Sequence, residues 1–341
     1  MMYEYLETND TVEQLIDKYD FVACKLRNSR IKSMDLAIRE VLFSFRDFLP
    51  IYLTNGPLSD VKGQFVIIIP KDKNFDIDLF NSIGYCNEFY NIDFNRKGDF
   101  VWKKHRFLLK KLLIQDENDY INEGSDKRPF KIKTKNGEIK DLIGYRGDGS
   151  ETGRRALPVE DCRVLINLSM PEKNKVVLDP FAGGGGIVYQ AKKQGLTVFS
   201  NDIDETVAPG LESYGSKHTI GDARDLCFET PIDCIATEVP FSANVTDVVC
   251  ESLKNVSSYL NENGMATIMC ADYQADKIKQ AMKSAKMKLC SENDIDRKGT
   301  SVKILNFTNS YQQFCEIQKL NKTLAPICYK GNSGTNEKEF C

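Results

Sequence analysis

The sequence has 341 residues, of which 41% are hydrophobic and 28% charged, values close to the averages of folded, water-soluble proteins. They exclude a disordered or fibrous chain and leave room for two domains, each with its own core. The formal net charge of -3 excludes an overall attraction to nucleic acid, so any such binding must come from a local patch.

The chain carries no sign of a membrane segment or of export. Its longest apolar run, 65–70, is far too short to cross a bilayer, and residues 1–10 are acidic and lack the pattern of a signal peptide. The 11 cysteines include no Cys-x-x-Cys pair and have no histidine nearby that would complete a zinc site. We therefore expect a cytoplasmic protein with reduced thiols, no membrane contact and no metal.

Residues 1–100 predict a small α/β module. Strands are expected at 21–26, 65–69 and 88–94, where β-branched and aromatic residues gather. Apolar residues at helical spacing predict a helix over 34–45 and a shorter one over 76–83.

Residues 101–150 predict a basic linker. An amphipathic helix over 101–113 contains Trp102, the single tryptophan, and Asn136-Gly137 favours a type I′ turn in a β-hairpin over 130–143. Between Trp102 and Arg155 the chain has 14 Lys and Arg residues against 9 Asp and Glu. This excess fits a nucleic-acid contact or, equally well, solvated surface charge.

Residues 151–310 alternate strands with helices, the pattern of a parallel sheet covered on both faces. The polar, glycine-rich stretch 144–153 marks the junction before this domain. A helix from Tyr311 and a polar tail make up 311–341. The expected strands are 176–178, 197–200, 232–236, 266–269, a segment around Lys288, and 302–307, and the expected helices are 187–194, 245–260 and 275–285.

Four segments at successive strand ends predict a ligand site, because ligands of such sheets bind beyond the carboxyl ends of the strands. Glycines permit a tight turn and let a ligand approach the backbone. Asp202 stands about 20 residues past the glycine turn, the spacing at which a carboxylate binds ribose hydroxyls, and Asp222 is placed to hold an exocyclic amine. The segments are Asp179-Pro-Phe-Ala-Gly-Gly-Gly-Gly186, Asn201-Asp202-Ile203-Asp204, Gly221-Asp222-Ala223-Arg224-Asp225-Leu226 and Thr237-Glu238-Val239-Pro240-Phe241.

Each of these features alone has a structural explanation. Tight turns need glycine for steric reasons, and an aspartate after a strand is more often a helix cap than a ligand contact. Four of them in order favour a ligand site.

A nicotinamide-dinucleotide site is the main rival within this fold. Its fingerprint requires a third glycine three residues after the second. With Gly183 and Gly185 as the first two, Val188 stands at the third position, where its side chain would hinder close packing near a pyrophosphate. A cofactor without phosphate does not need that approach.

The segment Asp179-Pro-Phe-Ala-Gly-Gly-Gly-Gly186 resembles motif I of the class I S-adenosylmethionine (AdoMet) dependent methyltransferases. Its Asp-Pro-Phe-x-Gly-x-Gly form is similar to that of the tRNA guanosine N2-methyltransferases with THUMP-type domains and of their DNA adenine methylase relatives. Residues 154–168 resemble the helix that enters this domain in those enzymes, and the likeness covers about 150–310. The N-terminal module does not clearly match a THUMP domain.

The resemblance implies an α/β fold with a Rossmann-like, seven-stranded sheet whose final strand is reversed, beside a smaller N-terminal α/β domain. It also implies AdoMet as the cofactor. Asp202 would then bind the ribose, Asp222 and Ala223 the adenine, and the backbone of 183–185 the methionine end. The implied cofactor-binding residues are Asp179, Phe181, Ala182, Gly183, Gly185, Asp202, Ile203, Asp222, Ala223 and Glu238.

The fourth segment departs from the family's motif, which reads Asp/Asn-Pro-Pro-Tyr/Phe. Here Glu238 supplies the acceptor for the target group, Phe241 supplies a stacking face, and Val239 replaces the first proline. The implied catalytic residues are Glu238, Pro240 and Phe241.

We therefore expect an AdoMet-dependent methyltransferase that acts on a nucleic-acid base, with tRNA or another RNA as the favoured substrate. The N-terminal module and the basic segment would present that RNA. The altered fourth motif keeps two alternatives open: methylation of a protein side chain or small molecule, and a catalytically silent AdoMet-binding subunit. A protein partner or a homodimer also stays open.

Overall fold

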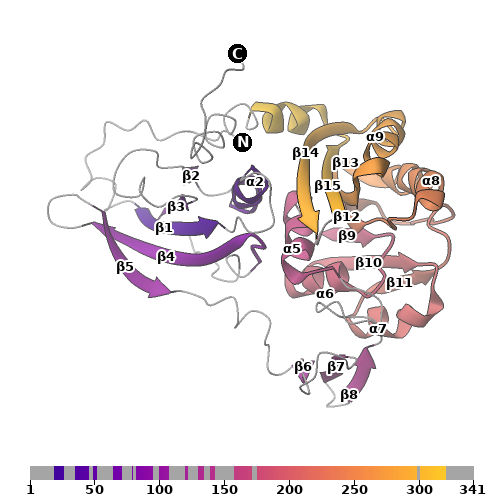
Figure 1. The fold of residues 1–341 in the computed structure, drawn as a ribbon, viewed down its shortest axis with the longest axis horizontal. Coiled ribbons are helices and arrows are strands. Elements are labelled where there is room, and N and C mark those ends of the chain that lie inside the picture. Colours follow the sequence, from indigo (N-terminus) through magenta and orange to yellow (C-terminus); the bar gives the residue numbers. More distant parts are fainter. Residues whose placement is uncertain are drawn as a thin grey trace. The chain divides into compact units, whose positions relative to one another are not determined.

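In the computed structural model the chain divides into two compact units (Figure 1). The first comprises Met1–Leu113 and Cys315–Cys341, and the second comprises Ile114–Phe314. The domain boundaries expected near residues 100, 150 and 310 stay predictions. The described residues are 19–26, 35–45, 49–51, 64–70, 79, 82–94, 100–106, 120–121, 130–133, 139–142, 157–170, 175–297 and 300–319.

The first unit contains a five-stranded antiparallel sheet in the order β2-β3-β1-β4-β5. The three strands and the helix predicted here are confirmed, whereas the short helix over 76–83 lies mostly outside the described residues. The elements are β1 (Tyr19–Leu26), α2 (Asp35–Ser44), β2 (Leu49–Ile51), β3 (Gln64–Pro70), β4 (Cys86–Phe94) and β5 (Phe100–Arg106).

The helix predicted over 101–113 is wrong in its first part, because residues 100–106 form strand β5. This strand pairs with β4, so that Trp102 lies opposite Ile92 and Phe100 opposite Phe94. Aromatic and β-branched residues favour an extended backbone, and β4 offers free hydrogen-bonding groups along its edge. Pairing with the preceding strand has therefore overridden the helical spacing, and 107–113 lie outside the described residues.

A buried carboxylate connects α2 to the segment before β4. Glu40 is 0% exposed, and its two carboxylate oxygens accept hydrogen bonds from the backbone N–H groups of Gly84, at 2.5 Å, and Tyr85, at 2.7 Å. Because an unpaired buried N–H is costly, this contact holds the segment against the helix.

The predicted hairpin is confirmed as β7 (Phe130–Lys133) and β8 (Ile139–Leu142), which pair antiparallel beside β6 (Tyr120–Ile121). Its turn at Asn136-Gly137 and the predicted junction over 144–153 lie outside the described residues.

The second unit is built on a seven-stranded sheet in the order β11-β10-β9-β12-β13-β15-β14, as Figure 1 shows. Neighbouring strands from β11 to β13 are parallel, and β15 alone is reversed, because it runs antiparallel to both β13 and β14. The α/β fold class and the reversed final strand are therefore confirmed. The strands are β9 (Val176–Asp179), β10 (Thr197–Asp202), β11 (Lys217–Ile220), β12 (Ile232–Glu238), β13 (Leu260–Ala271), β14 (Lys288–Arg297) and β15 (Thr300–Thr308).

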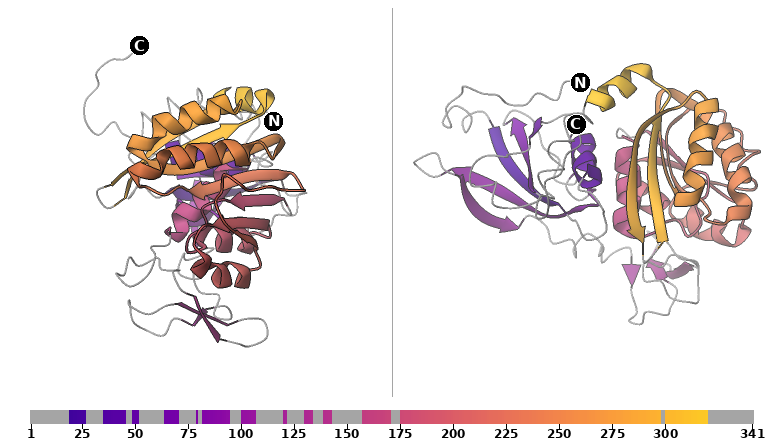
Figure 2. Two further views of the ribbon diagram at one scale, coloured as in Figure 1. Left: turned by 90° about the vertical axis from the view of Figure 1, so that its right-hand side faces the viewer. Right: turned by 45° about the horizontal axis from the view of Figure 1, so that its top comes forward.

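Helices cover both faces of this sheet, with α5 and α6 together on one face and α8 and α9 together on the other (Figure 2). The predicted helices correspond to α6, α8 and α9, whereas α7 and the short strand β11 were not predicted. Residues 311–319 form the expected C-terminal helix, and the tail beyond lies outside the described residues. The helices are α5 (Val159–Leu168), α6 (Gly186–Lys193), α7 (Ala208–Ser213), α8 (Thr246–Ser257) and α9 (Ala275–Ser284).

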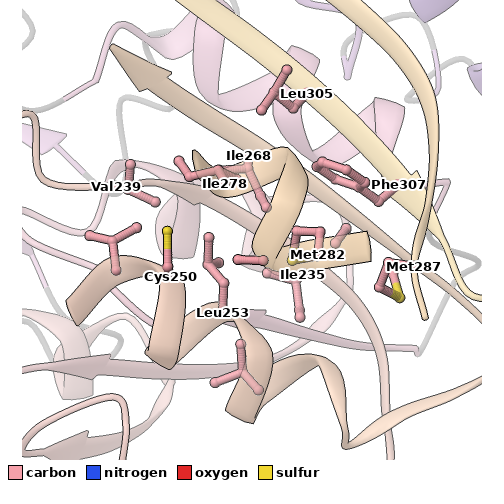
Figure 3. Packing of buried hydrophobic residues seen from close by; sticks show 14 of the residues in the cluster. Ile235, Val239, Cys250, Leu253, Ile268, Ile278, Met282, Met287, Leu305 and Phe307 are labelled. Carbon is pink, nitrogen blue, oxygen red and sulfur yellow. The ribbon is translucent and has the colours of Figure 1, made fainter. Parts of the chain in front are cut away.

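A hydrophobic core of the second unit lies between the sheet and the pair α8 and α9, as Figure 3 shows. Leu253 of α8 and Met282 of α9 are 0% exposed and pack toward Ile235 and Ile268 on the two central strands. Burial of these side chains fixes the sheet on which the strand ends are presented. None of the helices in the described part of the chain is both long and apolar enough to span a bilayer.

Replacing Ile268, which is 0% exposed on β13, by alanine should lower the free energy of unfolding by about 2–5 kcal/mol. The matched control is Ile220→Ala, because Ile220 on β11 is 53% exposed and should change that free energy by less than about 0.5 kcal/mol. Urea unfolding followed by circular dichroism measures both. Equal losses would contradict the assignment of Ile268 to the core.

Candidate active site

The glycine turn after β9 leaves part of its backbone uncovered. Gly183 and Gly185 have φ angles of +48° and +81°, in the region that favours glycine, and the Gly185 N–H donates to the carbonyl of Ala182 at 2.8 Å. A Cβ at Gly185 would lie 2.9 Å from Leu211 Cδ2, whereas a Cβ at Gly183 would have no atom within 4 Å. Gly185 is thus needed for packing, and the space over Gly183 is open.

The Asp202 carboxylate at the end of β10 binds this turn. Its Oδ2 accepts a hydrogen bond from the Gly183 N–H at 2.7 Å, and its Oδ1 accepts one from the Asp204 N–H at 2.9 Å. Asp202 is half-buried, and the next residue, Ile203, is 74% exposed. A negative charge and an apolar side chain therefore stand side by side next to the open space over Gly183.

Asn201, directly before Asp202, joins the turns on both sides of β10. Its side chain is 2% exposed, and its Nδ2 donates to the carbonyl oxygens of Pro180, at 3.2 Å, and Gly221, at 3.1 Å. The backbone carbonyl of Asn201 accepts a hydrogen bond from the Ala182 N–H at 2.9 Å. Sequence reasoning did not single out this residue, although it belongs to the predicted segment.

Asp179 is a buried carboxyl group between β9 and β12. It is 1% exposed, and its Oδ1 accepts hydrogen bonds from the Thr237 hydroxyl, at 2.7 Å, and from the Phe181 N–H, at 3.3 Å. Burial raises the pKa of Asp179 to about 7, and the charges of Asp202 and Glu238 add to this rise against the opposing effect of the two hydrogen bonds. The carboxyl group therefore titrates near neutral pH.

At the third turn, the Asp222 carboxylate binds Arg224. The guanidinium Nη2 lies 2.7 Å from Oδ2, the Arg224 N–H donates to Oδ1 at 2.9 Å, and Nη1 also reaches Glu251 at 3.3 Å. These hydrogen bonds hold the pKa of Asp222 below its usual value. The neighbouring Ala223 is 4% exposed, belongs to the core, and accepts from Asn255 Nδ2 through its carbonyl at 3.3 Å.

In the fourth segment, Glu238 is the half-buried last residue of β12. Val239 is 1% exposed, and its N–H extends the ladder to the carbonyl of Met269 at 2.9 Å. Pro240 is exposed and Phe241 half-buried, and the Phe241 carbonyl accepts a hydrogen bond from the hydroxyl of Tyr273.

The four predicted segments therefore meet at one edge of the sheet, after the adjacent strands β11, β10, β9 and β12. Several predicted residues serve the structure of the site. Phe181 packs on the core. The Ala182 N–H donates to the Asn201 carbonyl of β10, and the Ala182 carbonyl accepts from the Gly185 N–H within the turn. Thr237 belongs to the predicted fourth segment, but its hydrogen bond to Asp179 depends on the pairing of β9 with β12 and was not predicted. Tyr273 and Gln274, which follow β13, were not predicted.

Comparisons with known proteins find several similar chains. The family model of the D12 class N6 adenine-specific DNA methyltransferases matches residues 164–208. The tRNA (guanine(10)-N2)-dimethyltransferase of Methanothermobacter thermautotrophicus is 31% identical over 183 residues, which are 49% of this chain and 48% of that protein. The probable tRNA (guanine(10)-N2)-dimethyltransferase of Methanothermococcus thermolithotrophicus is 30% identical over 117 residues, which are 29% of this chain and 72% of that protein. The crystal structure of TrmN from Thermus thermophilus aligns with 85% of this chain and 99% of that one, at 13% identity and a TM-score of 0.46.

The strand order and the glycine turn define a class I methyltransferase domain. The chain belongs to the family of AdoMet-dependent methyltransferases that includes these tRNA (guanine(10)-N2)-dimethyltransferases. It spans about half the length of the first of these relatives, 48%.

The raised pKa of Asp179 makes a testable contribution to stability. The Asp179 carboxyl group binds a proton with a pKa of about 7 in the folded state and 3.8 in an exposed chain, so between these pH values the folded state binds more protons than the unfolded state. The free energy of unfolding should therefore fall as the pH rises from about 4 to about 7 and should then level off. Each pKa unit corresponds to about 1.4 kcal/mol, which makes the whole effect a few kcal/mol at most.

Asp179→Asn keeps the oxygen that accepts from Thr237 and removes the titration. Urea unfolding at several pH values measures the free energy of unfolding of both proteins. Because only the wild type loses stability as the pH rises, the free energy of the variant minus that of the wild type should increase up to about pH 7. A constant difference between the two proteins across this range would contradict the burial of a titrating Asp179.

Proposed function

We propose that this chain binds AdoMet at the carboxyl edge of its seven-stranded sheet and methylates a nucleic-acid base, with tRNA as the favoured substrate. The observation that carries this proposal is the Asp202 carboxylate bound to the Gly183 N–H, beside the open space over Gly183. The names of the relatives and the family to which the chain belongs support the same reading.

The residues present fit this cofactor. Asp202 offers carboxylate oxygens to the ribose hydroxyls, and the exposed side chain of Ile203 offers an apolar surface to the adenine ring. Asp222 is placed to accept from the adenine amino group, and the uncovered backbone at Gly183 has room for the methionine end. When bound, AdoMet supplies an electrophilic methyl group on a sulfonium.

Glu238 and Phe241 face the acceptor in this proposal. The charge of Glu238 contributes to the raised pKa of Asp179, and this supports a position of Glu238 beside the methionine end of the proposed cofactor site. There it accepts a hydrogen bond from the target amino group and orients its lone pair. Phe241 stacks on the base. Holding two reactants in line supplies much of the acceleration of a displacement reaction.

The RNA substrate is supported by the relatives, which are named for tRNA, and by the excess of basic residues between Trp102 and Arg155. The altered Glu238-Val239 pair favours a second candidate, methylation of a protein side chain or small molecule. Transfer of label from AdoMet into RNA or into protein extracts separates the two candidates.

Calorimetric titration of the purified chain should give micromolar AdoMet binding and no NAD binding. Asp202→Ala should weaken AdoMet binding by about 1 kcal/mol or more, because a hydrogen-bonded carboxylate is lost. The matched control is Asp204→Ala, which removes a carboxylate from the same segment that caps the Thr206 N–H at 2.8 Å. Equal weakening by both variants, or NAD binding in place of AdoMet, would sink the assignment of Asp202.

Labelled AdoMet should transfer its methyl group to unmodified tRNA, and Glu238→Ala should lower that rate by about tenfold or more. Glu262→Ala, an exposed glutamate near the opposite end of β13, should leave the rate unchanged. Binding to tRNA should weaken as salt rises. Unchanged transfer by Glu238→Ala would point instead to a silent AdoMet-binding subunit.

A further inference from the structure

Gln274 is a buried amide in the turn that follows β13. It ends the 3-10 turn η3 (Asp272–Gln274), directly before α9, and it is 0% exposed. A buried amide is costly unless its polar atoms are hydrogen-bonded, and both ends of this side chain are bound. The hydrogen-bond partners of the amide therefore explain why a glutamine is buried here, whereas apolar packing alone does not.

The amide of Gln274 joins three elements. Its Oε1 accepts from the Ala271 N–H at 3.1 Å, which caps the 3-10 turn from its third residue. Its Nε2 donates to the Pro240 carbonyl at 2.9 Å and to the Thr246 hydroxyl, at the start of α8, at 3.4 Å. The neighbouring Tyr273 hydroxyl donates to the Phe241 carbonyl. Two consecutive carbonyls of the fourth segment are thus bound by one turn.

The fourth segment needs such support. Its ladder contact with β13 ends at the Val239 N–H. The residues after Phe241, which are Ser242, Ala243 and Asn244, are exposed. Valine at 239 leaves its own φ free, whereas a proline would fix it. Without the contacts from 273 and 274, little in the described structure would hold the backbone at 240 and 241.

We propose that Gln274 is a positioning residue that sets the place of Pro240 and Phe241 relative to Glu238, and thereby the pose of the acceptor base. The part of this inference that concerns the acceptor base rests on the proposed function, whereas the part that concerns the backbone of 240 and 241 does not. The hydrogen bonds of Gln274 supply a constraint that the segment itself lacks. Tyr273 supports the same backbone from the exposed side, since its side chain is 58% exposed.

The test compares Gln274→Met with Asn306→Leu. Asn306 on β15 is the matched control, because it is also 0% exposed and its amide also donates to a backbone carbonyl and a threonine hydroxyl, those of Leu168 and Thr267. Both variants remove a buried amide of similar size and should destabilise the fold. Only Gln274→Met should loosen the fourth segment.

Hydrogen exchange followed by mass spectrometry, on the full chain, reads the amides of residues 241–245 without any substrate. We expect Gln274→Met to speed their exchange and Asn306→Leu to leave it unchanged. In the methylation assay with tRNA, kcat of Gln274→Met should fall by about tenfold or more, while the Kd for AdoMet stays within about threefold. Unchanged exchange at 241–245, or an equal increase in both variants, would overturn the proposal.

Tyr273→Phe covers the case in which Gln274→Met does not fold. It removes a single hydroxyl from an exposed side chain, and it should raise exchange at 241–245 without shifting the urea midpoint. If the wild type transfers no methyl group to tRNA, the proposed substrate is wrong. The exchange comparison then still decides whether Gln274 positions the segment, because it needs no substrate.

Discussion

The end of strand β10 holds the cofactor side of the site together. Asn201 binds the turns after both neighbouring strands through one buried amide, and Asp202 binds the backbone of the glycine turn through its carboxylate. The pairing of the parallel strands sets the spacing of the turns after β9, β10 and β11, but it does not set their conformation. Because these two residues pair the polar groups of the turns, the turns have a defined geometry before any ligand binds.

The acceptor side is held by different contacts. Its backbone at Pro240 and Phe241 is bound from the turn after β13, and not from β10. The two sides meet at Asp179 of β9, whose carboxyl group accepts from Thr237, the residue before Glu238 on β12. A change at Thr237 would therefore reach both the buried carboxyl group and the end of β12.

The parts of the site that the sequence predicts are those whose signal is local. Glycines with positive φ and aspartates at strand ends carry their meaning within a few residues, and so the turns at Gly183 and Asp202 could be predicted. Strand β11, with four residues and mostly exposed side chains, has no apolar pattern. The partners of Gln274 and Thr237 stand 34 and 58 residues away, so only the register of the sheet reveals them. Strand β5 was missed because its residues fit a helical spacing, although its partner β4 directly precedes it in the chain.

Asp202 and Asp222, the two carboxylates expected to bind the nucleoside, differ in the hydrogen bonds that a ligand must displace. Arg224 donates to both oxygens of Asp222 from its backbone N–H and guanidinium, which fills about the four sites that a carboxylate offers. An adenine amino group must therefore replace one of these bonds. Arg224 is exposed, so water can take over its released N–H at little cost. The Asp202 carboxylate accepts a hydrogen bond from the glycine turn, and a ribose must bind to it without breaking this hydrogen bond. In the proposed cofactor site, selectivity for the base would therefore depend on the third turn and binding of the sugar on the glycine turn and Asp202.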